Sequence, residues 1–233
     1  MRRRWAAAVA LVLASGCMEF DPVGPGGEAY FVLLLQSLNP GPGTAPDTLS
    51  VSGFVSHVRG AEFTDETLRI GERAIAPAMN PFGFRSYSDT LLFSPATLAQ
   101  PRTVTLPRPA GQPLAPQEFL FQSAARRGPE TLTVGAGQDV VLPVEPGALT
   151  AAAAEPIEER WSVSLLRGQK SSDIAATSPL PRSIVIPASL VPVDTASEMD
   201  VVVRSTKSLR ASAGGNVYVD VQAHLRWRVR IAP

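Results

Sequence analysis

The last strand-like segment constrains the fold more than any other part of the chain. Every odd position from 217 to 231 is apolar, while the even positions from 218 to 230 carry Tyr, Asp, Gln, His and three Arg. A period of two is the geometry of a β-strand with one buried face. A strand over residues 217–231 would extend about 50 Å, so we expect a bulge or a bend in it. The segment Ala213–Asn216 predicts a hairpin turn to a partner strand beginning near Met199.

Turn residues divide the rest of the chain into short strand-like runs. The 22 prolines and 18 glycines interrupt the sequence too often for most helices. The run 30–38 is almost continuously apolar, which is typical of a strand buried on both faces. Pro187, within the run 183–190, indicates an edge strand or a bulge. Many short strands separated by turns predict an all-β sandwich or barrel.

From residue 128 onward, the strand series resembles an immunoglobulin-like or fibronectin type III domain. The segments GQDVVLPVEPG, RWSVSLLRG, SIVIPASLV and MDVVVRS precede the final strand in that order. The resemblance implies a β-sandwich over residues 128–233 in which Trp161 packs against the opposite sheet. Trp227 lies on the apolar side of the final strand, and we expect it in the core. We also expect a second β-sandwich of similar size over residues 28–127.

The first residues have the three parts of an export signal. Arg2, Arg3 and Arg4 precede an apolar run of about 10 residues, which is too short to span a bilayer. The order Leu-Ala-Ser-Gly-Cys that ends at Cys17 resembles the lipobox of bacterial lipoproteins, although Ala14 stands where that family favours Leu. The resemblance implies cleavage before Cys17 and acylation of its thiol. The alternatives are a plain signal peptide, an uncleaved anchor, or twin-arginine export.

Cys17 is the only cysteine, so the chain has no intramolecular disulfide, and acylation would remove a free thiol from an oxidising compartment. Enterobacterial lipoproteins retained at the inner membrane carry Asp after this cysteine. Met18 stands there instead and favours the outer membrane of the cell envelope. The predicted organisation is a signal peptide at 1–16, a flexible tether at 17–27, and tandem sandwich domains at 28–127 and 128–233.

No motif indicates catalysis or a cofactor. The sequence lacks G-x-S-x-G, H-E-x-x-H and Walker patterns, and His57 and His224 are too few for a zinc site. The acidic pairs 65–66 and 158–159 do not form a calcium loop, although calcium between the sandwiches stays an alternative. Residues 1–16 hold three arginines and no acid, so the mature chain has 18 basic and 21 acidic residues. That balance argues against a nucleic-acid partner.

The polar face of the final strand is the candidate contact surface. Arg226, Arg228 and Arg230 follow one another at about 7 Å, with Tyr218 on the same face. These residues are candidates for contact with anionic lipid headgroups or an acidic partner. The interpretation that we favour is a solvated face whose charges discourage edge-to-edge aggregation. We expect a non-catalytic envelope lipoprotein, anchored to a membrane by its lipid and acting as a structural or protein-interaction module. The alternative is a carbohydrate-binding or glycan-processing lipoprotein.

Overall fold

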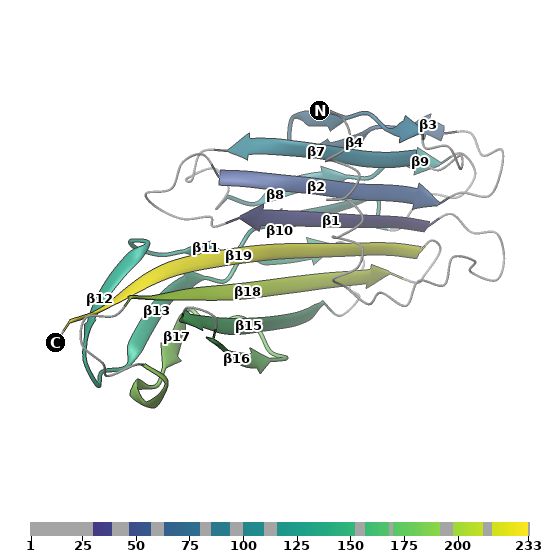
Figure 1. Ribbon diagram of the computed structural model, residues 1–233. Coiled ribbons are helices and arrows are strands. Elements are labelled where there is room, and N and C mark those ends of the chain that lie inside the picture. The colour runs from purple at the N-terminus through teal and green to yellow at the C-terminus, as the bar shows by residue number, and fades with distance from the viewer. Residues whose placement is uncertain are drawn as a thin grey trace.

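Strands account for almost all the regular structure of this protein (Figure 1). The computed structural model describes residues 30–38, 47–56, 63–79, 85–93, 100–109, 116–151, 157–167, 170–191, 198–211 and 216–232. Within these ranges the helical structure is a single 3-10 turn, η1 (Ala188–Leu190). The predicted all-β fold is therefore confirmed.

A nine-stranded sheet extends along the whole molecule (Figure 1). Its strands, in spatial order, are β16 (Lys170–Ala176), β15 (Glu158–Arg167), β18 (Glu198–Ala211), β19 (Asn216–Ala232), β1 (Tyr30–Leu38), β2 (Asp47–Ser56), β7 (Arg85–Phe93) and β6 (Ala78–Met79). The ninth strand, β12 (Thr131–Gly135), pairs with β19 beyond the end of β1. Strands from the beginning and the end of the chain thus share one sheet.

Three smaller sheets complete the described structure. The first has the order β14 (Ala148–Ala151), β10 (Glu118–Gln122), β8 (Arg102–Thr105), β4 (Leu68–Ile70) and β5 (Arg73–Ile75). The second has the order β11 (Ala125–Arg126), β13 (Val140–Glu145) and β17 (Ser183–Ile186). The third consists of β3 (Phe63–Asp65) and β9 (Arg108–Pro109).

The predicted C-terminal hairpin is confirmed as the pair β18–β19. Its register runs without a shift from Glu198 opposite Arg230 to Ala211 opposite Val217. The expected long strand therefore has no bulge against β18, and Figure 1 shows it curving instead. The turn residues 212–215 lie outside the described residues. On its other side β19 pairs in parallel with β1 along its first half and with β12 near its end.

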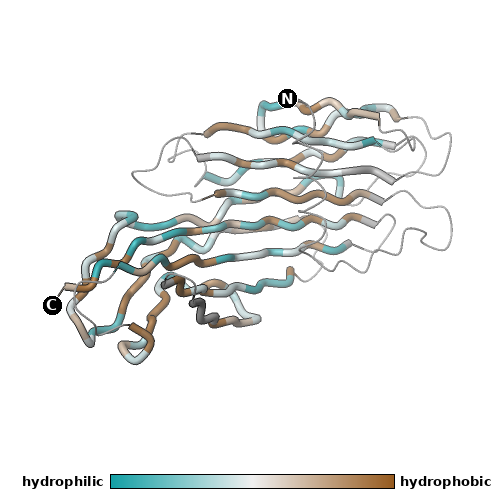
Figure 2. The backbone as a smooth tube through the Cα atoms, in the orientation of Figure 1, coloured by the Kyte–Doolittle hydropathy of each residue, from teal (hydrophilic) through white to brown (hydrophobic). Residues whose placement is uncertain are grey.

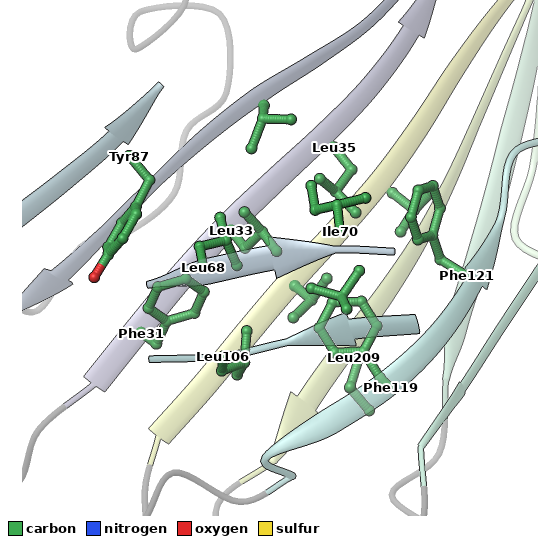
Figure 3. Close-up of a cluster of buried hydrophobic side chains, with 14 of the residues drawn as sticks. Phe31, Leu33, Leu35, Leu68, Ile70, Tyr87, Leu106, Phe119, Phe121 and Leu209 are labelled. Carbon is green, nitrogen blue, oxygen red and sulfur yellow. The ribbon is translucent and has the colours of Figure 1, made fainter. Parts of the chain in front are cut away.

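Two apolar cores lie along the inner face of this sheet. The first is enclosed between the five-stranded sheet and strands β1, β2, β7 and the first part of β19 (Figure 3). The second lies between the β13–β17 pair and strands β15, β18 and the rest of β19. Most members of the first core lie between positions 31 and 121, but Leu149, Leu209 and Val217 also belong to it. The cores therefore do not follow a division of the chain between residues 127 and 128.

Strand β1 is buried on one face only, so the expectation of burial on both faces is wrong. Phe31, Leu33 and Leu35 are fully buried, whereas Val32 and Leu34 remain partly exposed. The reason is that the outer face of the nine-stranded sheet, whose pairs are mostly antiparallel, is turned to solvent. Along β19 the hydropathy alternates with the same period of two (Figure 2).

The predictions for Pro187 and the two tryptophans are testable in the second core. Pro187 directly follows β17, which among the described strands pairs only with β13, so the prediction of an edge strand is confirmed. Trp227 is completely buried in the second core, as expected. Trp161 packs against the same core from β15 but is only partly buried.

A band of polar side chains separates the two cores. Ser37, Ala223 and Ser205 lie side by side on the inner face of β1, β19 and β18. Ser123, in the connection between β10 and β11, donates a hydrogen bond of 2.6 Å from its Oγ to Ser37 Oγ. One row further along, Lys207 Nζ lies 2.6 Å from Glu159 Oε1. We call these polar residues the polar seam: Ser37, Ser123, Glu159, Ser205 and Lys207.

Gly147 lies where two connections of the chain pass each other next to the polar seam. Its φ is +51°, and a Cβ there would lie 2.5 Å from the backbone nitrogen of Ala124 and 2.6 Å from the carbonyl oxygen of Gln122. Backbone atoms cannot move aside as a flexible side chain can. Only glycine therefore fits without displacing the segment that carries Ser123.

We predict that Gly147→Ala lowers the free energy of unfolding by more than the about 1 to 2 kcal/mol that a left-handed alanine costs, because atomic overlap adds to it. Gly137→Ala is the matched control, since Gly137 has φ +72° and a Cβ added there would meet no described atom within 4 Å. Urea unfolding followed by tryptophan fluorescence measures both variants. Equal losses of unfolding free energy in the two variants would contradict the atomic overlap predicted at Gly147.

Candidate functional site

The predicted lipidation site lies outside the described residues, which begin at Tyr30. The same holds for the signal peptide, for the expected tether and for His57. Cleavage and acylation at Cys17 therefore stay predictions. The structure does describe the other four candidate residues, Tyr218, Arg226, Arg228 and Arg230, all on β19.

The three arginines at the end of β19 face solvent together with two acidic residues of β18. Arg226 Nη2 lies 2.8 Å from Asp200 Oδ2, and Arg230 Nε lies 2.9 Å from Glu198 Oε1. Arg228, between them, has its Nε 3.9 Å from a carboxylate oxygen of each acid. We call this set of five residues the charge ladder. Its arginines are paired within the protein rather than presented to a ligand.

The acidic partners were missed by the sequence reasoning. Glu198 and Asp200 stand about thirty residues before the arginines, yet the hairpin register places them directly opposite Arg230 and Arg228. A signal was present in the sequence, because Glu198 and Asp200 occupy even positions, and the even positions of β18 form its polar face. Counting outward from the hairpin turn would have paired them with the arginines. The geometry supports the solvated-face interpretation, in which opposite charges across two strands contribute modestly.

Tyr218 is separate from the charge ladder. It lies eight residues before Arg226 on the same strand, a distance of about 26 Å. Its neighbours across the sheet are Arg210 on β18 and Val32 on β1. The residue is 40% exposed, and it is the one aromatic among the exposed large hydrophobic residues of the described part of the chain. The four predicted contact residues therefore form two sites rather than one.

His224 lies between these two sites, half-buried on the outer face. Its Nε2 is 3.4 Å from Gln36 Nε2, and Arg204 stands opposite it on β18. Burial lowers the pKa of His224 below its usual value, and the positive charge of Arg204 lowers it further. The ring is therefore kept neutral at neutral pH. This agrees with a structural histidine rather than a charged contact.

Three of the four acidic residues considered for calcium are engaged with basic side chains. Glu66 Oε1 lies 2.7 Å from Arg85 Nη2, and Asp65 Oδ2 lies 3.8 Å from Arg69 Nη2. Hydrogen bonds from Thr67 lower the pKa of Asp65 and hold its carboxylate locally. Glu159 pairs with Lys207 in the polar seam. Among the described residues, no group of three or more His, Cys, Asp or Glu is arranged to hold a metal ion.

The chain shares little detectable similarity with known proteins. No protein-family model matches it, and no curated protein matches its sequence. Among solved structures, the FN1–FN3 domains of chicken CNTN1 are similar at 11% identity with a TM-score of 0.26. That match covers 84% of this chain and 67% of the other. Of the residues described, none belongs to a helix long and apolar enough to cross a membrane.

We predict that the exposed and buried ion pairs differ in their contribution to stability. Arg226→Ala and Arg230→Ala should each lower the free energy of unfolding by less than about 1 kcal/mol, because their pairs are exposed. Lys207→Met should lower it by about 2 kcal/mol, because it leaves the mostly buried Glu159 carboxylate without a cation. Denaturant unfolding at equal ionic strength tests both, and a larger loss at Arg226 than at Lys207 would contradict the assignment.

The lowered pKa of His224 predicts that the protein loses stability in mild acid. Its pKa in the folded protein lies below the usual value of 6.5, so the unfolded chain binds the proton more readily. The stability that depends on neutral His224 is therefore complete above about pH 6.5 and declines as the pH falls below it. We expect His224→Gln to show a smaller decline in unfolding free energy between pH 7 and pH 5 than the parent protein. An unchanged decline would assign the pH dependence to other groups.

Proposed function

We propose that this protein is an exported lipoprotein, cleaved before Cys17 and anchored in the cell envelope by acyl groups on that cysteine. The observation that carries the proposal is the order of three arginines, an apolar run and small residues ending at the only cysteine of the chain. Two acyl groups anchor a protein far more firmly than one, so a diacylated Cys17 would hold the chain stably at a membrane. Met18 supports the outer membrane as its location.

We assign the folded part a non-catalytic role as a structural or protein-interaction module. The long sheet with two cores supports this role, because it gives an extended surface. Several described acidic residues are paired with arginine or lysine, in the charge ladder and at Glu66 and Glu159. Such ion pairs favour a role in surface contacts over a role in acid–base catalysis.

Mass spectrometry of the mature N-terminus tests the anchor. We expect the first residue to be Cys17 carrying acyl groups, and we expect the protein in the membrane fraction of the cell. Cys17→Ser should abolish acylation and release the chain from that fraction, since a serine lacks the thiol that is modified. Ser15→Ala is the matched control, because it keeps a small residue beside the cut and should leave acylation unchanged.

A mature chain that begins at another residue, or that carries an unmodified Cys17, would overturn the anchor. The interaction role is tested separately, by crosslinking in cells that express the anchored protein. Recovery of a specific envelope partner supports it. Hydrolysis of an envelope substrate by the purified protein, without any such partner, would overturn it.

A further inference from the structure

The start of β1 marks the end of the sheet at which the N-terminal segment joins the fold. Tyr30 is the first residue of β1 and lies opposite Asn216, the first residue of β19. Because the two strands are parallel, both begin at the same end of the nine-stranded sheet (Figure 1). Twelve residues, 18–29, separate Cys17 from this end. The predicted tether, as a coil of that length, would span about 20 Å on average and at most about 45 Å.

Tyr218 and the charge ladder lie at very different distances from that end. Tyr218 is two residues into β19, about 7 Å from its start. Arg226 to Arg230 lie about 33 to 46 Å from the same start. A bilayer held about 20 Å from Tyr30 is therefore much nearer to Tyr218 than to the charge ladder.

The arginines near the two ends also differ in their partners. Arg210 is exposed and stands directly opposite Tyr218, and it forms no ion pair with any acid in the described part of the chain. The arginines of the charge ladder are paired with Glu198 and Asp200. Asp220, the acid nearest to Tyr218 on β19, accepts a hydrogen bond of 2.7 Å from Ser208 Oγ. Arg210 thus keeps its donors available for an anionic group such as a phosphate.

We propose that Tyr218 and Arg210 form a contact with phospholipid headgroups, and that the charge ladder is held away from the membrane. This inference rests on the proposed lipid anchor at Cys17. Tyrosine is favoured at the membrane–water interface because its ring is amphipathic, and arginine near an anionic leaflet is attracted to it. The molecule then stands on the end where β1 begins, and β12, β13 and β17 are presented away from the bilayer.

Fluorescence quenching on vesicles tests this orientation with the acylated full-length protein. Acylation blocks Cys17, so a single introduced cysteine is the only thiol available for a dye. Ser52→Cys places the dye level with Asp220, near the proposed contact, and Thr133→Cys places it opposite Arg230. Both positions are exposed. The vesicles contain phosphatidylethanolamine, phosphatidylglycerol and a lipid with a quencher on its headgroup.

We expect the dye at position 52 to be quenched at least threefold more than the dye at position 133. Arg210→Ala with Tyr218→Ala should reduce this difference by at least half, whereas Arg226→Ala with Arg230→Ala should leave it unchanged. Arg210→Gln alone serves the same purpose if the double variant does not fold by circular dichroism. Equal quenching at both positions in an acylated protein would overturn the orientation alone. An unmodified Cys17 in the mass spectrum would overturn the anchor and the orientation together.

Discussion

The pairing of β18 with β19 is the interaction on which the rest of the structure depends. The hairpin is paired along all of β18, and its inner face supplies apolar residues to both cores. Leu209 and Val217 belong to the first core, while Val201 and Trp227 belong to the second. Because one rigid ladder extends through both, neither core can shift along the sheet without breaking the register of the other.

Charges contribute differently on the two faces of this hairpin. On the outer face, the charge ladder offsets three arginines with two acids and leaves a surface of low net charge. On the inner face, the Lys207–Glu159 pair and the serines of the polar seam separate two apolar clusters. Buried polar groups restrict the arrangements available to their neighbours, since each must find its partner. The Ser123–Ser37 hydrogen bond in the polar seam therefore links the connection between β10 and β11 to the large sheet.

The sequence pattern identified most of the longer strands but neither β14 and β16 nor the assembly of the sheets. Alternation identified β19, and Pro187 identified an edge, because both are local properties of the chain. The parallel pairing of β1 with β19 joins residues almost two hundred positions apart, and no local pattern encodes it. The apolar run of β1 suggested burial on both faces, since Val32 and Leu34 look the same in sequence as Leu33. The same limit hid the acids opposite the arginines, because only the register reveals them.

The parallel pair β1–β19 also affects the order in which the parts of the protein can fold. Residues from 216 onward supply a wall to each core, so a chain that lacks them exposes apolar surface from β1 to β17. Contacts between such distant residues form late and slowly. Both cores therefore stay incomplete until β19 joins the sheet.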